Sequence, residues 1–260
     1  MRDLLRVAAV QQNIIWEKSE ANRDALEQIL AAQKGNADIV ILPEMFTTGF
    51  SMSPKSLAEP EEGETLKWMK QVATSASFAL CGSIIVESNA RYYNRFYFVE
   101  PSGRVSWYDK RHLFRMGDEH NHYAPGNERK IISYLGWRIM PQICYDLRFP
   151  VFSRNRNDYD LLIYVANFPA SRRGVWNTLL PARAIENQCY VVAVNRVGTD
   201  GVGLDYSGDS AIYNPRGNAM VRAAENKEVV VMAEVSLSEL NSFRERFPVW
   251  LDADDFTIKL

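Results

Sequence analysis

The chain has 260 residues, 47% of them hydrophobic and 24% charged, and its formal net charge is −2. That balance is ordinary for a globular protein with a sizeable core, and it gives no support to nucleic-acid binding or to membrane attraction through a basic patch. Every apolar run is far shorter than the ~20 residues of a membrane span, so we expect no membrane partner either.

Short apolar runs alternate with helical patterns from the start of the chain. Residues 4–10 and 38–42 are predicted as buried strands, and residues 21–34 carry a helical apolar stripe that Gly35 would end. Residues 54–63 are rich in Pro, Glu and Gly, which predicts a surface loop. The next expected elements are a helix at 64–73, strands at 79–86 and 92–100, and a short strand at 104–108.

Residues 110–127 break this alternation, because they are polar and contain all three histidines of the chain. A loop of this length inside a compact domain is usually functional or disordered. The alternation then resumes with a strand before Cys144, a short helix at 149–156 and a strand at 160–166. A helix at 176–188 and a strand at 190–195 are expected next. The last expected elements are a hairpin at 209–213 and 219–221, a strand at 228–234 and a helix at 237–247. Because no linker or repeat divides this pattern, we predict one α/β domain over residues 1–260.

Three cysteines, Cys81, Cys144 and Cys189, are widely spaced and odd in number. This favours free thiols in a reducing cytoplasm over a disulfide framework, and the charged N-terminal residues do not read as a signal peptide. Cys81 and Cys189 lie inside apolar runs, which predicts plain core positions. Cys144 instead ends an apolar run just before a charged, turn-prone segment, so its thiol is expected at the end of a buried strand.

Two charged residues, Glu44 and Lys110, also follow predicted strands. Alone, each has an ordinary explanation as a cap or a surface charge. Because ligands bind beyond the carboxyl ends of strands in α/β sheets, the carboxylate, the ammonium and the thiol of Cys144 can meet in one pocket. A thiol with a pKa near ~8.5 needs a base, which Glu44 could supply. Lys110 and the backbone N–H of Tyr145 could then stabilise an oxyanion.

These stretches resemble the motifs of the nitrilase superfamily of carbon–nitrogen hydrolases. The matching segments are 42–44 with Glu44, 108–114 with Lys110 and 143–150 with Cys144, and residues 182–188 resemble a helix of the family. The resemblance implies a four-layer α-β-β-α sandwich, no metal and no cofactor. It also implies a homodimer or higher homo-oligomer, packed through helices near the nucleophile.

The resemblance assigns roles to three further residues. Glu119 precedes Gly126 as a second glutamate does in the family, and it would orient Lys110 and the substrate nitrogen. Asp146 and Arg148 would brace the chain beside the nucleophile as an ion pair or a cap.

Within the superfamily, the chain looks most like the bacterial omega-amidase branch. That branch hydrolyses the side-chain amide of 2-oxoglutaramate or 2-oxosuccinamate to the 2-oxo acid and ammonia, through a thioester. Aliphatic amidases, N-carbamoyl amidohydrolases and nitrilases share these catalytic residues and stay as alternatives. A substrate carboxylate needs a cation, and an apolar wall could limit the acyl chain. The candidate substrate-binding residues are Arg115, Phe168, Arg172, Arg173 and Trp176, with Phe46 as a further apolar candidate.

Three rival hypotheses come from other classes of protein. His112, His120 and His122 could hold a metal ion, although their spacing fits no standard zinc pattern. His112 or His120 could instead be the base of a papain-like Cys–His pair. The third rival is an inactive scaffold for protein interaction. The complete set of Cys144, Glu44, Lys110 and Glu119 favours the hydrolase over all three.

Overall fold

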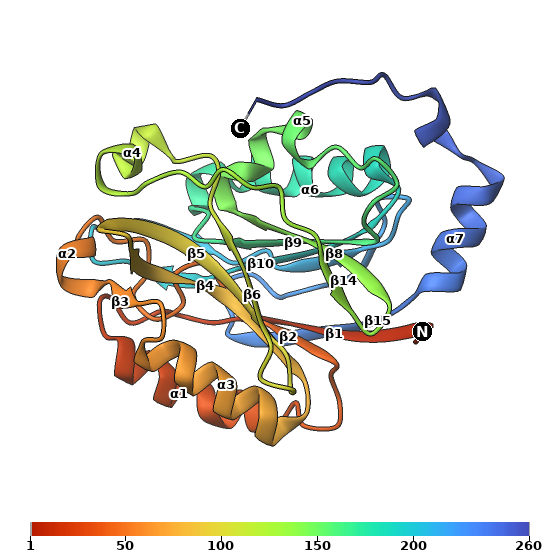
Figure 1. Cartoon of the computed structure of the whole chain (residues 1–260). Coiled ribbons are helices and arrows are strands. Elements are labelled where there is room, and N and C mark those ends of the chain that lie inside the picture. Colours follow the sequence, from red (N-terminus) through yellow and green to blue (C-terminus); the bar gives the residue numbers. More distant parts are fainter. Residues whose placement is uncertain (1, 260) are drawn as a thin grey trace.

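Two stacked β-sheets form the centre of the structure, a computed structural model that describes residues 2–259 (Figure 1). Helices α1 (Ser19–Ala31) and α3 (Glu64–Ala76) cover one outer face. Helices α5 (Pro150–Ser153) and α6 (Arg173–Asn187) cover the other. The predicted four-layer α-β-β-α sandwich is therefore confirmed.

The first sheet has the strand order β15-β1-β2-β4-β5-β6, with β3 beside β4. Strands β1, β2 and β4 are parallel, and β6 returns to the same direction because it pairs antiparallel with β5, which pairs antiparallel with β4. The chain segments that follow β2 and β6 therefore leave the sheet at the same edge. The strands are β1 (Leu4–Gln11), β2 (Ile39–Ile41), β3 (Glu59–Pro60), β4 (Ala79–Ser88), β5 (Arg91–Val99), β6 (Val105–Asp109) and β15 (Val229–Ser236).

The second sheet has the order β14-β13-β10-β9-β8-β7, and its strands β8, β9 and β10 are parallel. The segments that follow the carboxyl ends of β8 and β9 carry Cys144 and Asn167. The strands are β7 (Ile132–Tyr134), β8 (Trp137–Ile143), β9 (Leu161–Ala166), β10 (Tyr190–Asn195), β13 (Ala211–Tyr213) and β14 (Ala219–Arg222). A separate hairpin joins β11 (Val197–Thr199) to β12 (Asp205–Ser207), and α7 (Leu237–Arg246) follows β15.

Strand β2 shows how the layers are held together. Ile39 and Ile41 pack in the core between the two sheets, whereas Val40 and Leu42 pack under α1 and α3. Successive strand side chains point to opposite faces, so a continuous apolar run is what a strand buried on both faces requires. Fully burying an aliphatic side chain of this size contributes roughly 1.5–3 kcal/mol.

The structure corrects several predicted elements. The loop expected at 54–63 contains the short helix α2 (Pro54–Leu57) and strand β3. Helix α1 ends at Ala31, before Gly35, which lies in the following turn at φ +77°. The segment 110–127 contains the 3-10 helix η1 (Arg115–Gly117) and α4 (Glu119–His122), and the strands β7, β11 and β12 were not predicted. Apart from α1, these elements span two to four residues, which is too few for a periodic pattern to form.

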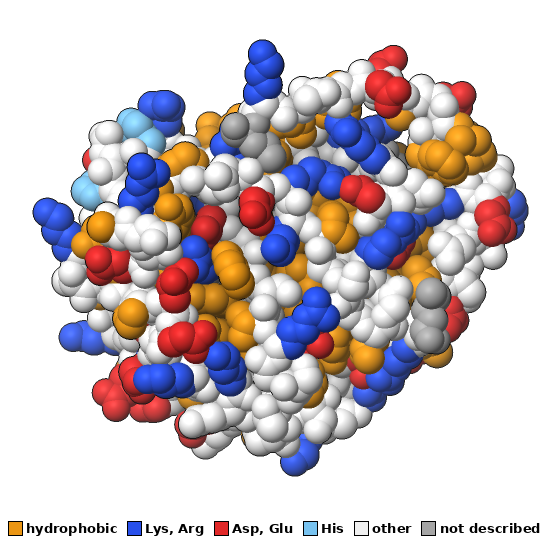
Figure 2. Space-filling model, viewed as in Figure 1, with side chains coloured by type: hydrophobic (Ala, Val, Ile, Leu, Met, Phe, Trp, Pro, Cys, Tyr) orange, Lys and Arg blue, Asp and Glu red, His pale blue; other side chains and the backbone are white. Residues whose placement is uncertain are grey.

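The surface carries charges of both signs. On the face drawn in Figure 2, basic and acidic side chains are interspersed, in line with the small net charge of the chain. Among residues 2–259, no helix combines the length and apolar character needed to cross a membrane.

Candidate active site

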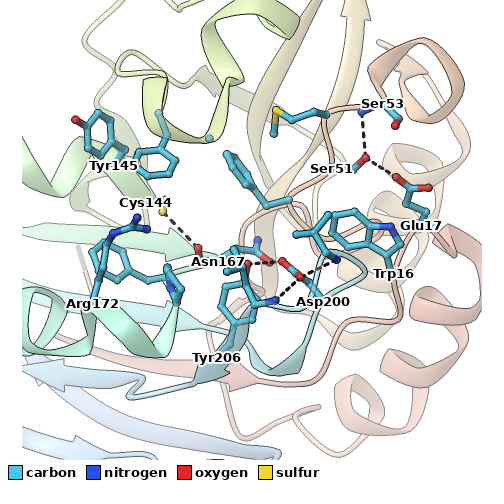
Figure 3. Close-up of a pocket in the computed structure, with 18 of the residues that line it drawn as sticks. Trp16, Glu17, Ser51, Ser53, Cys144, Tyr145, Asn167, Arg172, Asp200 and Tyr206 are labelled. Carbon is cyan, nitrogen blue, oxygen red and sulfur yellow. Dashed lines mark hydrogen bonds between the residues drawn. The ribbon is translucent and has the colours of Figure 1, made fainter.

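Cys144 lies where β8 ends and the 3-10 helix η2 (Cys144–Arg148) begins. Its backbone has φ +46°, in the left-handed region that residues with a side chain rarely adopt. The thiol opens on a cavity of about 470 Å³, with Sγ 3.9 Å from the carbonyl oxygen of Asn167 (Figure 3). Strained backbone of this kind persists only where surrounding contacts hold it, and it is concentrated at functional sites.

Glu44, Lys110 and Glu119 form a single charged cluster. The Lys110 Nζ lies 2.8 Å from Glu44 Oε1 and 3.0 Å from the Glu119 carboxylate, and all three side chains are 0% exposed. Glu44 and Lys110 arrive from the ends of β2 and β6, and Glu119 begins α4. The structure thus brings together the charged residues that the sequence singled out, next to Cys144.

Neutral N–H groups donate further hydrogen bonds to the carboxylates of Glu44 and Glu119. The Asn94 side-chain amide donates to Glu44 Oε1 at 2.8 Å and lies 3.4 Å from Glu119 Oε1. The backbone N–H of Asn167 donates to Glu44 Oε2 at 2.7 Å, and that of Phe114 donates to Glu119 Oε2 at 2.6 Å. Neither asparagine was predicted from the sequence. A signal existed for each, because Asn94 is a polar residue inside a buried strand and Asn167 directly follows β9.

The charges of the cluster shift one another's pKa values. Burial disfavours the Lys110 ammonium, but Glu119 and Glu44 outweigh burial and raise its pKa. Burial raises the pKa of Glu119 against the opposing effect of Lys110. Burial and the Glu44 carboxylate raise the pKa of the Cys144 thiol well above its ordinary value, despite Lys110. These directions favour a protonated lysine and a protonated thiol in the resting site, so the thiol needs a base when it attacks.

Asp146 caps the turn that carries Cys144. Its buried carboxylate accepts the backbone N–H of Ile143 at 2.9 Å and the hydroxyl of Tyr108 at 2.8 Å. The predicted ion pair between Asp146 and Arg148 is wrong, because Arg148 is exposed and its side chain belongs to the wall of the cavity. The alternative prediction of a cap describes Asp146 correctly.

The cavity in front of Cys144 is lined by cationic, aromatic and acidic side chains. Figure 3 shows Cys144, Tyr145 and Arg172 on one side and Trp16 with Glu17 on the other. Tyr145 is the second residue of η2, where helix N–H groups have no acceptor inside the helix. Its backbone N–H is thus in the part of the turn that suits an oxyanion donor.

Two of the five predicted substrate-binding residues line this cavity, namely Arg172 and Phe168. The Arg172 guanidinium lies 5.0 Å from the centre of the Phe114 ring. Arg148, which was predicted from the sequence to have a structural role, is a second cation in the cavity lining. The cavity therefore offers two arginines to an anionic group of a ligand.

The other predicted pocket residues lie outside the cavity lining. Trp176 is 1% exposed and packs behind Phe168, with ring centres 5.1 Å apart. Arg173 is held in an ion pair with Asp209 at 2.6 Å. Arg115 is exposed, and Phe46 packs against Trp68 on the helix-covered side of the first sheet.

The histidines occupy separate environments. His112 Nδ1 lies 2.7 Å from Asp146, whereas His122 Nε2 lies 3.2 Å from Asp118 on the surface. Within residues 2–259, no group of three or more His, Cys, Asp and Glu side chains has the arrangement of a metal site, and no histidine lines the cavity. The metal hypothesis and the Cys–His hypothesis therefore gain no support from the geometry.

Comparison with known proteins gives consistent matches. A family model described as carbon-nitrogen hydrolase matches residues 6–245. The omega-amidase YafV of Escherichia coli strain K12 is 47% identical over 256 residues, covering 98% of each chain. The 2-oxoglutaramate amidase of Bacillus subtilis strain 168 is 32% identical, covering 95% of this chain and 96% of its own. A CN-hydrolase superfamily protein of Xanthomonas campestris, with an arsenic adduct in its active site, has 45% identity and a TM-score of 0.96, covering 99% of this chain and 100% of that chain.

Proposed function

This chain belongs to the carbon–nitrogen hydrolase family, and we propose that it hydrolyses the ω-amide of a small 2-oxo dicarboxylic acid monoamide to the 2-oxo acid and ammonia. The omega-amidase and 2-oxoglutaramate amidase among its relatives support this substrate class. One observation carries the chemistry. The Cys144 thiol opens on the cavity, while Glu44 and Lys110 are fully buried beside it.

In the proposed first half-reaction, Glu44 takes the thiol proton as Cys144 Sγ attacks the amide carbon. The carbonyl oxygen becomes an oxyanion, held by the Lys110 ammonium and the backbone N–H of Tyr145. Glu44 then gives its proton to the amide nitrogen, the C–N bond breaks, and ammonia leaves behind a thioester. Glu119 fixes Lys110 in place during these steps, since its carboxylate is 3.0 Å from Nζ.

In the second half-reaction, Glu44 takes a proton from water, and the resulting hydroxide attacks the thioester carbon. The C–S bond breaks, the proton returns to Cys144, and the 2-oxo dicarboxylic acid leaves. The carboxylate of the substrate would meet Arg172, and Arg148 offers a second cation, because both arginines line the cavity. Phe168 would bound the acyl chain, because it also lines the cavity.

Ammonia release from a panel of compounds tests this function. The panel contains 2-oxoglutaramate, 2-oxosuccinamate, glutamine, an N-carbamoyl amino acid, a simple aliphatic amide and a nitrile. We expect the highest kcat/KM for the two 2-oxo acid monoamides. A clear preference for a compound without a carboxylate would contradict the omega-amidase proposal and leave membership of the family intact.

The proposal extends to a homodimer in the cytoplasm. Val151 on α5 and Ile185 on α6 are exposed apolar side chains on helices close to the nucleophile turn, with 59% and 54% of their surface accessible. Burying them against a second copy would remove this apolar surface from water. Light scattering of the purified chain should give twice the monomer mass of 29.7 kDa. A monomer at micromolar concentration would contradict it.

A further inference from the structure

The Asp146 carboxylate joins two catalytic segments of the chain. Oδ2 accepts the backbone N–H of Ile143 at 2.9 Å and the Tyr108 hydroxyl at 2.8 Å. Oδ1 accepts the backbone N–H of His112 at 3.0 Å and faces the His112 ring nitrogen Nδ1 at 2.7 Å. The Asp146 side chain is 0% exposed, so these contacts replace water entirely.

The partners of Asp146 flank the catalytic residues in the sequence. Ile143 directly precedes Cys144, and Tyr108 and His112 stand two residues before and after Lys110. One carboxylate therefore ties the turn that carries the thiol to the turn that carries the ammonium. The tie is needed, because the left-handed backbone of Cys144 costs about 1–3 kcal/mol and persists only when neighbouring contacts hold it.

His112 is itself held in one orientation. Its ring stacks on Phe149, with centres 3.8 Å apart and planes 6° from parallel, and it meets Phe152 edge-on at 5.3 Å. The stack belongs to the segment just after η2, so the ring packs on the turn that it also bonds. Packing fixes the ring plane, and the bond to Asp146 uses the Nδ1 atom.

We propose that Asp146 and His112 are positioning residues that keep the Cys144 thiol opposite Glu44 and Lys110. This inference rests on the proposed function, because it assigns those three residues to the chemistry. Neither positioning residue lines the cavity. Their loss should therefore lower kcat and thiol reactivity while leaving the affinity for substrate nearly unchanged.

Three substitutions at one position separate the ring from its hydrogen bond. His112→Phe keeps a ring to stack on Phe149 and removes the donor to Asp146. His112→Asn removes the ring but places an amide N–H near the position of Nδ1, and His112→Ala removes both. Each purified full-length variant is measured for ammonia release from 2-oxoglutaramate, for alkylation of Cys144 by iodoacetamide, and for thermal unfolding.

We expect His112→Phe to lower kcat about 10²-fold, the effect typical of a misplacement near 1 Å at a reacting group. Its KM should change less than about threefold, since the cavity wall is untouched, and alkylation of Cys144 should slow by at least about tenfold. His112→Asn should recover most of kcat, whereas His112→Ala should not. Cys81 and Cys189 do not interfere with the alkylation assay, because both are 0% exposed.

His122→Phe is the matched control. His122 also faces an aspartate, but that pair is largely exposed and lies at 3.2 Å on the surface of α4. We expect wild-type kcat and alkylation for this variant. If His112→Phe proves unstable, Tyr108→Phe removes a different bond to Asp146 while keeping the buried ring, and it should show the same split between kcat and KM.

Wild-type kcat and alkylation in both His112→Phe and Tyr108→Phe would overturn the proposal, as would a loss in His112→Asn equal to that in His112→Phe. A change confined to KM would also overturn it. The alkylation assay needs no substrate. If the wild-type chain fails to hydrolyse 2-oxoglutaramate, the proposed substrate is wrong, and the alkylation rates still decide whether the pair positions the thiol.

Discussion

The two ends of the active site differ in how tightly their charges are held. At the closed end, Glu44, Lys110 and Glu119 are fully buried, and each carboxylate oxygen has a hydrogen-bond partner. At the open end, Arg148 and Arg172 line the cavity and are partly or largely exposed to solvent. Preorganised charges at the closed end suit the stabilisation of a transition state. The exposed arginines at the open end can instead set which substrate binds, and few substitutions there would alter that choice. This difference predicts large losses of rate at one end and changes of KM at the other.

The largest effect is expected at the nucleophile. Cys144→Ala should reduce ammonia release by at least about 10⁴-fold, because removing a catalytic nucleophile leaves only binding and oxyanion stabilisation. Binding of 2-oxoglutaramate, measured by calorimetry, should persist, since the open end is unchanged. Cys189→Ala is the matched control, because it removes a thiol from the core and should keep turnover. Residual turnover in Cys144→Ala near the wild-type rate would exclude the thioester mechanism.

The next effect couples activity to stability at the closed end. Lys110→Met removes the ammonium and leaves two carboxylates buried without their cation, which should lower the free energy of unfolding by about 3–5 kcal/mol. Loss of the oxyanion donor should lower kcat about 10²–10³-fold. Urea unfolding and ammonia release measure the two effects.

A double variant sharpens this test. Lys110→Met with Glu119→Gln removes one buried charge of each sign, so part of the lost stability should return while activity stays low. If Lys110→Met alone is as stable as the wild-type chain, the cluster does not hold its charges as the distances indicate. If the double variant is less stable than the single one, Glu119 does more than balance the lysine.

At the open end, substitutions should change KM. Arg172→Met should raise KM for 2-oxoglutaramate about 10–100-fold, the range expected for losing a charged hydrogen bond worth about 1.5–3 kcal/mol. The KM of an uncharged aliphatic amide should change little. Arg115→Met is the matched control, because Arg115 is exposed and outside the cavity lining. Equal losses in both variants would exclude a specific carboxylate contact at Arg172.

The closed end could be predicted from the sequence because its residues follow strands. Glu44 and Lys110 come soon after β2 and β6 of the first sheet, and Cys144 follows β8 of the second. Positions beyond the carboxyl ends of strands are where α/β sheets bind ligands. The core positions of Cys81 and Cys189 followed from the same apolar pattern, and both are buried.

The open end could not be predicted in this way. Its wall combines side chains from distant segments, among them Trp16 in a turn and Tyr206 on β12, and no periodic pattern links such segments. The family resemblance paired Arg148 with Asp146 as an ion pair or a cap, but Asp146 is buried whereas Arg148 is exposed and lines the cavity. The prediction for Trp176 was also wrong, because its position on α6 puts it behind Phe168 and outside the cavity lining.

The smallest effect concerns the protonation of the Cys144 thiol. The rate at which this thiol is alkylated tests the closed end through its pH dependence and the open end through the charge of the reagent. Burial and Glu44 raise the pKa of Cys144, so its thiolate fraction should increase about tenfold per pH unit from pH 7 to beyond pH 9. The rate of alkylation by iodoacetamide should rise with the same slope, whereas that of a cysteine in an unstructured peptide should level off above the ordinary thiol pKa of about 8.5. Iodoacetate, an anion of similar size, should react faster relative to iodoacetamide if Arg172 attracts it, and Arg172→Met should abolish that preference without changing the pH slope. A plateau below pH 8 in the wild-type chain would mean that Lys110 stabilises a resting thiolate, and Glu44 would then have no thiol proton to remove.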